Sequence, residues 1–402
     1  MRENQVATPK RGRRVKRVIG RAALAMFGLA VVLGVASHVF PTFGAALADH
    51  VRAIFGPRVV AWAEDVTYGI EDLIKRVVYR DAPPKQFWDA PPPPPRPAPP
   101  PVPAGEVATA PPVPAFAPTA FAPPVPSVAG PSDGVWIAVA DAEQPDEPPR
   151  FYKTIIHPDK RRSFAAVAVV AIDLARVGLT LVPGTVEPAS TALPRARRPG
   201  IVPADQLADL LAAFNGGFKA EHGHFGMMLD GVTLLPPRDT SCTIGLYQDG
   251  SLQIRSYPAL QDSAADLRAY RQTPPCLVEE GQINSRLSDS SKGWGAAVGG
   301  DTVIRRSALG LSADRKTLFY GLGVSVTADS LARAMLAAGA ANAAQLDVNA
   351  IYPRFLFYAH PADEPPIVDS PLIPDIEFGK HEYVGAPEVR DFFFLTRKHP
   401  PS

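Results

Sequence analysis

The stretch "AAFNGGFKAEHGHFG", residues 212–226, joins an apolar run to an Asn-Gly-Gly step and two histidines. The apolar run "PADQLADLLAAF", residues 203–214, favours a helix, with a proline near its start and leucines on one side. Asn215, Gly216 and Gly217 tolerate positive φ and would close that helix. The second glycine and the asparagine exceed what a helix end needs, because residues without side chains let a ligand approach backbone amides. A helix end and a binding site both remain open here.

The histidines of "HGHFG" form a second feature of this stretch. His222 and His224 would share one face of a strand, as metal ligands do. Only Glu221 lies nearby to complete a ligand set, so a polar loop beside the site is the alternative. His224 is a candidate general acid for a leaving phosphate. No cofactor is predicted, and a divalent metal is left open.

Short apolar runs bounded by turn residues surround this stretch and predict strands. Asp249-Gly250 in "YQDGSLQI" is typical of a tight hairpin turn. The segment "TADSLARAMLAAGA", residues 327–340, predicts a helix with Thr327 as its N-cap and a glycine near its end. Strands outnumber helices, so we expect an α+β domain over residues 133–400, with a mixed, largely antiparallel sheet and packed helices. The other strand candidates are "VWIAVAD", "FAAVAVVAIDL", "GMMLDGVTLL", "TLFYGLGV" and "DFFFLTR".

A basic flank and a long apolar segment occupy the start of the chain. Residues 1–21 carry eight basic side chains against one acid, Glu3, and residues 22–40 carry no Lys, Arg, Asp or Glu. As a helix, the second segment would reach about 28 Å, enough to cross a bilayer. The basic flank places the N-terminus in the cytoplasm. We therefore expect a single-pass protein of the inner (cytoplasmic) membrane, with a periplasmic or extracellular C-terminal domain. A signal peptide cleaved near Ala46-Leu47-Ala48 is the alternative.

Two further segments separate this predicted transmembrane anchor from the domain. Residues 45–80 include an amphipathic helix whose apolar positions recur every three or four residues from Val59 to Val77. Its apolar stripe needs a partner, which could be the membrane surface, the domain, or a second copy of the chain through residues 57–79. Residues 83–132 contain twenty prolines and predict an extended spacer, which we interpret as a stalk. A Pro-rich ligand for another protein is the alternative.

Composition excludes several classes of protein. The net charge is +1, with 41 basic and 40 acidic side chains, so nothing indicates nucleic acid as a partner. Cys242 and Cys276 lack metal-ligand spacing, and they could form one disulfide or remain two buried thiols. The chain has no nucleotide-binding loop, no Gly-x-Ser-x-Gly elbow and no zinc spacing, so these enzyme classes have no support.

Two blocks of the sequence resemble the phosphodiester glycosidases. The first, "AAFNGGFKAEHGHFGMMLDG", is similar to the Asn-Gly-Gly-Phe-Phe segment of that family. The second, residues 305–347, begins "RRSALGL", ends "AAQLD" and is similar to the family's next block, in the same order. The resemblance covers roughly residues 134–396. It implies hydrolysis of a sugar-1-phosphodiester at the anomeric carbon, with a glycan or sugar phosphate as the partner.

The resemblance also implies site residues in both blocks. A guanidinium at Arg306 would grip phosphate oxygens, and the amides of Gly216 and Gly217 would stabilise negative charge. The carboxylate of Asp347 would act as base, nucleophile or cation stabiliser. The other positions carried over from the family are Asn215, Phe218, Gly226 and Gly310.

One departure from the family bears on activity. Leu-Asp-Val-Asn-Ala at residues 346–350 replaces the family's Leu-Asp-Gly-Gly-Gly-Ser, and the β-branched Val348 disfavours positive φ. Asn349 and Arg354 are candidates to replace the lost contacts. Trp294 is a candidate to stack on a sugar ring, with a half-buried loop aromatic as the alternative. Two functions remain open: a membrane-anchored envelope hydrolase of a surface glycan, and a catalytically inactive glycan-binding or scaffold domain of the same fold.

Overall fold

The computed structural model describes residues 57–89, 116–289, 291–294 and 303–399. The chain divides into two units, Met1–Glu71 with Ala297–Gly299 and Asp72–Ala296 with Gly300–Ser402. The described part of the first unit is the beginning of helix α3, Pro57–Val78. The predicted basic tail and apolar span, residues 1–40, lie outside the described residues. Among the helices that the structure describes, none is long and apolar enough to cross a membrane.

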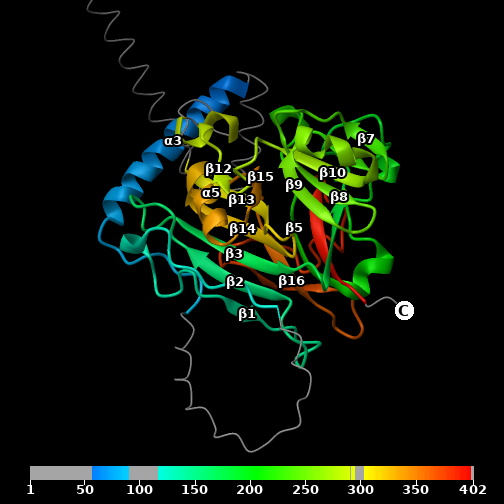
Figure 1. Cartoon of the computed structure of the whole chain (residues 1–402), viewed down its shortest axis with the longest axis horizontal. Helices are drawn as coiled ribbons and strands as arrows, with labels where there is room; N and C mark the ends of the chain where they lie inside the picture. Colours follow the sequence, from blue (N-terminus) through cyan, green and yellow to red (C-terminus); the bar gives the residue numbers. More distant parts are fainter. Residues whose placement is uncertain (1–56, 90–115, 290, 295–302, 400–402) are drawn as a thin grey trace, which may run out of the picture. The chain divides into compact units, whose positions relative to one another are not determined.

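The described strands of the second unit form three sheets, and the strand pairs within these sheets are antiparallel (Figure 1). The eight-stranded sheet contains, in spatial order, β1 (Ile137–Val139), β2 (Phe151–Ile156), β3 (Ala166–Asp173), β14 (Thr317–Val326), β13 (Ile304–Leu311), β15 (Asn342–Val348), β11 (Val278–Glu279) and β12 (Gln282–Ile283). The prediction of an α+β fold with a largely antiparallel sheet is confirmed.

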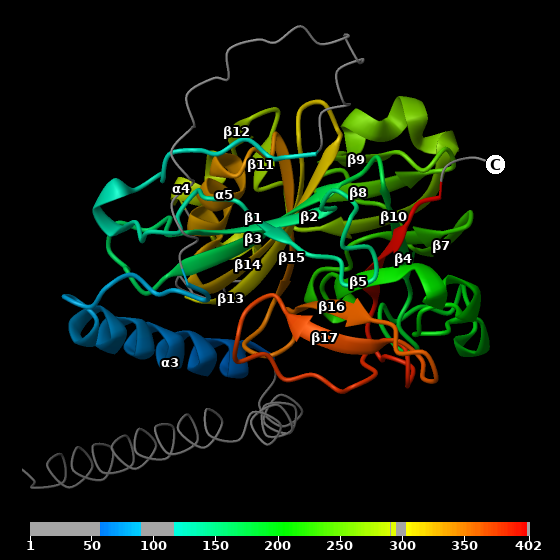
Figure 2. The same cartoon turned by 90° about the horizontal axis from the view of Figure 1, so that it is seen from below.

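Two five-stranded sheets complete the fold. The first, seen beside the eight-stranded sheet in Figure 2, contains β7 (Val232–Leu235), β6 (Met227–Leu229), β10 (Leu267–Thr273), β8 (Cys242–Tyr247) and β9 (Leu252–Ser256). The second contains β17 (Ile367–Pro371), β16 (Phe355–Ala359), β5 (Leu210–Asn215), β18 (Phe392–Arg397) and β4 (Val177–Val182). The remaining described helices are α4 (Arg286–Asp289), α5 (Ala328–Ala337) and the 3-10 helices η1 (Pro126–Val128), η2 (Arg195–Arg197), η3 (Ala204–Asp209), η4 (Ala220–His222), η5 (Tyr257–Asp266) and η6 (Ser291–Trp294).

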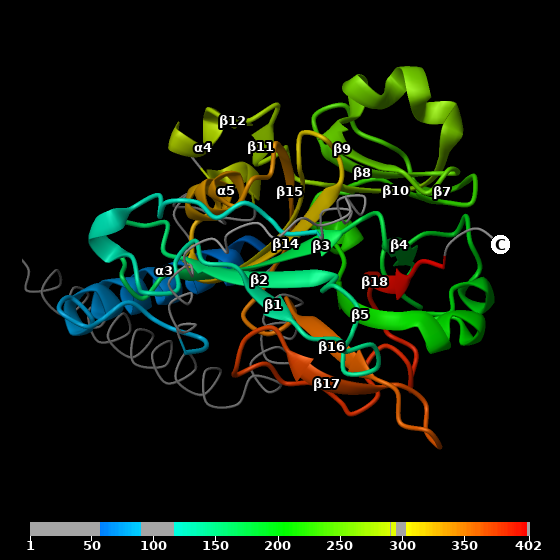
Figure 3. The same cartoon turned by 60° about the horizontal axis from the view of Figure 1, so that its bottom comes forward.

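The eight-stranded sheet is covered on both faces. Every residue of β3 is buried, as its uninterrupted apolar run predicts. Met335 of α5 packs in one cluster with Val169 of β3, while Val170 packs in the other cluster with Phe214 and Phe393 of the β5 sheet. Figure 3 shows α5 and the β5 sheet on opposite sides of the eight-stranded sheet. Alternate residues of one strand therefore belong to different cores.

The predicted helix over residues 203–214 is wrong. Only Ala204–Asp209 are helical, as η3, and the chain then enters β5, whose six residues are all buried. An uninterrupted apolar run fits a strand buried on both faces as well as it fits a buried helix. The strand forms because β16 and β18 pair with it on either side, and Phe214 stacks at 5.6 Å on Phe355 and at 5.4 Å on Phe393, between ring centroids.

The hairpin and the second helix are confirmed. Strands β8 and β9 pair across the predicted turn, where Gly250 has a φ of 80°. Helix α5 begins after Thr327, whose side chain accepts a hydrogen bond from the Ser330 amide at 3.1 Å. Gly339 follows the helix with a φ of 106°. In both places the local sequence contains the residues that the backbone conformation requires.

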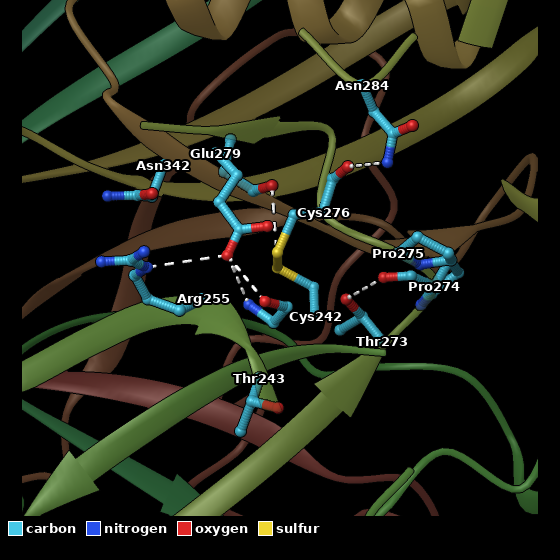
Figure 4. Close-up of a disulfide and its surroundings, with 12 residues drawn as sticks. Cys242, Thr243, Arg255, Thr273, Pro274, Pro275, Cys276, Glu279, Asn284 and Asn342 are labelled. Atoms are coloured by element: carbon cyan, nitrogen blue, oxygen red, sulfur yellow. Dashed lines mark hydrogen bonds and ion pairs between the residues drawn. A yellow bond between two sulfur atoms is a disulfide. The ribbon is translucent and has the colours of Figure 1, made fainter. Parts of the chain in front are cut away.

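The disulfide between Cys242 and Cys276 is also confirmed. Cys242 begins β8 and Cys276 precedes β11, so the bond links a five-stranded sheet to the eight-stranded one (Figure 4). The two Cα atoms lie 4.6 Å apart. Beside the bond, the Glu279 carboxylate accepts hydrogen bonds from the amide and hydroxyl of Ser256, at 2.8 and 2.9 Å.

Both described ends of the predicted Pro-rich linker pack on the second unit. At the first end, Trp88 contacts the core that contains β5, and the Lys85 carbonyl lies 2.9 Å from Nε2 of His157. At the second end, Phe121 packs edge-on against Trp136, with ring centroids 6.0 Å apart. The packed unit thus begins before residue 133. Residues 90–115 of the predicted linker lie outside the described residues.

Candidate active site

Asn215 ends β5 and connects four segments of the chain. Its side-chain amide nitrogen donates to the Gly216 carbonyl and to Oγ of Ser307, each at 2.9 Å. Its Oδ1 accepts from the Tyr320 hydroxyl at 2.8 Å and from the Arg354 amide at 3.2 Å. Asn215 has no solvent exposure. Both polar atoms of its side chain are used within the protein, so Asn215 positions its neighbours around the end of β5.

The two glycines after Asn215 allow a close approach to Asp391. The Gly216 amide donates to the Asp391 carbonyl and the Gly217 amide donates to its carboxylate, both at 3.0 Å. A Cβ on Gly216 would lie 2.1 Å from Oδ2 of Asp391, and one on Gly217 would lie 2.9 Å from Cζ of Arg271. Neither glycine has a positive φ. The sequence needs glycine here for space, and the interpretation of this step as a helix end is wrong.

Arg271 of β10 holds the other side of the Asp391 carboxylate. Its Nε and Nη2 donate to Asp391 at 2.9 and 3.2 Å, and both side chains are completely buried. The same guanidinium donates to the carbonyls of Phe218 and Phe225. A buried carboxylate and guanidinium need such complete pairing, because each would lose its hydration without compensation. The pair fixes the loop that follows Asn215 against β10 and the start of β18.

Asp347 lies at the end of β15 and forms an ion pair with Arg390. Its Oδ2 lies 2.9 Å from Nη1 of Arg390, and the two side chains are 5% and 11% exposed. Nη2 of Arg390 donates to the Gly217 carbonyl at 2.9 Å, and the guanidinium lies 3.8 Å from the ring centroid of Tyr352. The ion pair therefore adjoins the loop that Asp391 and Arg271 hold.

Tyr352 completes this group. Its hydroxyl donates to the Asp391 carbonyl at 2.9 Å, and burial raises its pKa well above the ordinary value. The phenol therefore stays protonated at neutral pH and remains a donor. The acid, the arginine and the phenol come from β15, the start of β18 and the loop between β15 and β16. They meet at the Asn-Gly-Gly step, and we take this group as the candidate active site.

The Asn-Gly-Gly step and Asp347 of this site belong to the two sequence blocks described above. Residues 208–347 match the family model of the phosphodiester glycosidases. The match contains both blocks, and it confirms the resemblance of this chain to the phosphodiester glycosidases.

The comparison with solved structures gives low similarity. The catalytic domain of zebrafish N-acetylglucosamine-1-phosphodiester alpha-N-acetylglucosaminidase, auto-inhibited by its pro-peptide, has 14% identity and a TM-score of 0.40, covering 66% of this chain and 88% of its own. A hypothetical protein from Synechocystis has 11% identity and a TM-score of 0.38, covering 63% of this chain and 65% of its own. At these values the structures support no argument about this chain. No curated protein sequence matches it.

Four of the predicted site residues come together in the structure. The amides of Gly216 and Gly217 donate to Asp391, and Ser307, which accepts from Asn215, donates to the Asp347 carbonyl at 3.4 Å. The two glycine amides do not point to an empty space, because Asp391 accepts from both. The Gly217 amide, which the resemblance implied for a substrate anion, thus already donates to a carboxylate, and the Gly216 amide donates to a backbone carbonyl.

Arg306 and Trp294 form a separate group inside the core. Arg306 has no exposure, and it donates to the carbonyls of Trp294 and Val326 and to Oε1 of Gln345, at 2.6, 3.2 and 3.1 Å. Burial lowers the pKa of Arg306 to about 10. Trp294 is 1% exposed and its Nε1 donates to the Pro275 carbonyl, so its ring cannot stack on a sugar. The expected roles of both residues in substrate binding do not agree with these positions.

The glycines and the phenylalanine carried over from the family serve packing. Phe218 is 6% exposed and packs edge-on against Phe225, with ring centroids 5.6 Å apart. The Gly226 amide donates to Oε1 of Gln272 at 3.1 Å. A Cβ on Gly310 would lie 2.7 Å from that of Ala340, so this glycine lets the segment after α5 approach β13.

The last predicted residues lie in loops. His224 is exposed, with a φ of 49°, and His222 ends the 3-10 helix η4, so the two do not share a strand face. Oδ1 of Asn349 accepts from the Ile351 and Tyr352 amides and closes its own turn. The Arg354 guanidinium forms an ion pair with Glu382. Within the described residues, no group of three or more His, Cys, Asp or Glu could hold a metal ion.

Sequence reasoning missed most of the charged partners. Arg390 and Asp391 directly precede a strand that the sequence predicts, and Tyr352 lies in the segment that replaces the family's glycine loop. The sequence did contain a signal for Arg390 and Asp391, since an Arg-Asp pair at the start of a fully apolar strand is unusual. For Arg271, in the middle of β10, only the fold shows which acid it meets.

Proposed function

We propose that this protein hydrolyses the bond between the anomeric carbon and the oxygen of a sugar-1-phosphodiester in a surface glycan. Water supplies the oxygen that replaces the phosphate oxygen at the sugar, and a phosphomonoester leaves. The observation that carries the proposal is the position of Asp347. It is the carboxylate at the end of the family-matched region, and it lies with Arg390 at the Asn-Gly-Gly loop.

The chemistry of the reaction fits this pair. Positive charge develops at the anomeric carbon as the bond breaks, and a nearby carboxylate stabilises that charge or attacks the carbon. The departing phosphate is anionic, and a guanidinium is the side chain best suited to its oxygens. Asp347 supplies the first group and Arg390 the second. Because both are almost buried, their charges act in surroundings of low dielectric constant.

A catalytically inactive glycan-binding or scaffold domain of the same fold is the second candidate function. It is favoured by Asn349, which closes its own turn where the family has a glycine loop. It is also favoured by the direct pairing of Asp347 with Arg390, whose Nη1 lies 2.9 Å from Oδ2 of Asp347. In this function the same surface would hold a glycan without turnover.

The proposal includes a location outside the cytoplasm. Residues 22–40 would anchor the chain in the inner membrane, and the disulfide between Cys242 and Cys276 suits an oxidising compartment. The apolar row of α3 remains exposed at Leu73, Ile74 and Val77, which is consistent with a second copy or a membrane surface as its partner. Residues 57–79 are therefore the segment through which we propose oligomerisation.

The experiment that tests the function compares the full chain with Asp347→Asn and with Asp363→Asn, an exposed acid in another loop. Each protein is incubated with a panel of chromogenic sugar-1-phosphodiesters, and released sugar is measured. We expect the parent and Asp363→Asn to turn over, and Asp347→Asn to lose at least about 10³-fold in kcat/KM with its thermal unfolding retained. A folded parent that binds the sugars and releases nothing would favour the glycan-binding function.

A further inference from the structure

Arg198 is a buried arginine without a hydrogen-bond partner for most of its guanidinium. It follows η2 and is 4% exposed. Its Nε and Nη2 are buried and have no partner in the described part of the chain. An unpaired buried donor destabilises the folded protein, and a charged one does so more strongly. Burial accordingly lowers the pKa of Arg198 from its ordinary value.

Backbone contacts place the segment of Arg198 beside the active-site loops. Glu388 donates its amide to the Gly200 carbonyl at 2.6 Å, two residues before Arg390. Glu187 donates its amide to the Val389 carbonyl at 2.8 Å. The Glu187 carboxylate accepts from the Ala220 amide at 2.9 Å, so the same segment also reaches the loop that follows the two glycines.

The acids near Arg198 already have other partners. Asp391 and Glu187 are the acids that favour the charged form of Arg198, but neither forms an ion pair with it in the described structure. Asp391 is held by Arg271 and by the Gly217 amide. Glu187 accepts from the amides of Ala189 and Ala220. Asp391 also acts on Arg390, so both arginines belong to one electrostatic group.

We infer that Arg198 binds an anionic phosphate oxygen of the substrate, next to the segment 388–391, whose Glu388 amide donates to the Gly200 carbonyl. This inference rests on the proposed function and assigns the phosphate subsite to a residue that precedes the family-matched region. Nε and Nη2 form one edge of a guanidinium, and two oxygens of one phosphate group can accept from that edge in parallel. Arg306, the arginine that the sequence favoured for this role, has its donors committed to core carbonyls.

The chain provides a matched control. Arg197 is the preceding residue, carries the same charge and is exposed. Arg198→Met and Arg197→Met therefore remove the same charge from neighbouring positions, one buried and one in solvent. Arg198→Lys retains the charge and removes the two-donor edge. Isothermal titration calorimetry of the full chain with inorganic phosphate measures binding without any need for turnover.

We expect Arg198→Met to raise the Kd for inorganic phosphate at least about tenfold, because the charge-assisted bonds to the anion are lost. Arg198→Lys should raise it less, because the charge remains. Arg197→Met should keep the parent Kd. Without phosphate, Arg198→Met should unfold at the same temperature as the parent or a higher one, since the substitution removes a buried unpaired charge. An arginine with only a structural role would give the opposite sign.

Equal phosphate Kd values for the parent and Arg198→Met would overturn the inference, as would a parent that binds no phosphate. So would an Arg198→Met variant that unfolds at a lower temperature or fails to fold.

The outcome of the phosphate-binding experiment can be separated from the outcome of the test of function. If phosphate binding depends on Arg198 while the parent hydrolyses no phosphodiester, the hydrolase proposal fails and the anion site remains. If the parent hydrolyses the panel and the Kd for phosphate does not depend on Arg198, only the assignment of the phosphate subsite to Arg198 is wrong.

Discussion

Arg306 and Ser307 are neighbours in β13, but their side chains enter two different parts of the molecule. Arg306 donates to the carbonyls of Trp294 and Val326, within the core that α5 covers. Ser307 accepts from Asn215 and lies 3.4 Å from the Asp347 carbonyl, at the candidate active site. Successive residues of a strand point to opposite faces, so one short motif serves both faces.

The two faces of β13 give Arg306 and Ser307 different roles. On the Arg306 face, a charged side chain donates to the buried backbone carbonyls of Trp294 and Val326. On the Ser307 face, short polar side chains connect Asn215 to the ion pair of Asp347 and Arg390. A residue that a family motif contains can thus be required for folding without touching a substrate. The faces make different predictions for substitution.

Arg306→Met should give the largest loss of stability on the core face. The Val326 carbonyl, the Trp294 carbonyl and Oε1 of Gln345 each lose a bond from Arg306, and we expect the free energy of unfolding to fall by about 2 to 4 kcal/mol. Turnover per folded molecule should stay at the parent value, because Arg306 donates to Trp294, Val326 and Gln345 of the core. Urea denaturation followed by kinetics below the transition measures both quantities. A stable variant without turnover would show that the two faces are not separate.

A pair of glycine substitutions compares the faces directly. Gly217→Ala places a methyl group 2.9 Å from Cζ of Arg271, and Gly310→Ala places one 2.9 Å from Cε of Met335. Overpacking should cost each variant about 1 to 3 kcal/mol. Only Gly217→Ala should also reduce kcat, by at least about tenfold, because it displaces groups that hold the active-site loop. Equal kcat values in the folded variants would contradict this assignment.

The sequence predicts those features whose cause is local. Thr327 and Gly339 mark the ends of α5, and Asp249-Gly250 marks a hairpin turn, because each position requires a residue of that kind. The β5 strand was predicted as a helix, since an uninterrupted apolar run is compatible with both. Its conformation depends on pairing with β16 and β18, which lie far away in the chain.

The candidate active site shows the same limit. The Asn-Gly-Gly step and Asp347 are visible in the sequence because their residue types are unusual in an apolar context. The acid that the glycines contact, Asp391, is 174 residues from Gly217. A contact over this separation in the chain produces no periodicity or spacing in the sequence from which it could be predicted. The role of Gly217 therefore became clear only from the distance that a Cβ would have to Arg271.

Tyr352→Phe should give the smallest effect and tests the active-site face most finely. The substitution removes the hydrogen bond to the Asp391 carbonyl and leaves an aromatic ring against Arg390. The free energy of unfolding should fall by about 0.5 to 1.5 kcal/mol.

Tyr358→Phe is the matched control, since it removes a phenol that donates to the Glu382 carbonyl at 2.7 Å. Both variants should lose similar stability, and thermal denaturation checks this expectation. A fall in kcat is expected only for Tyr352→Phe, because the Asp391 carbonyl also accepts from the Gly216 amide. If Tyr358→Phe lowered kcat equally, the loss would come from general destabilisation, and the Tyr352 hydroxyl would have no particular role in positioning the loop of Asp391.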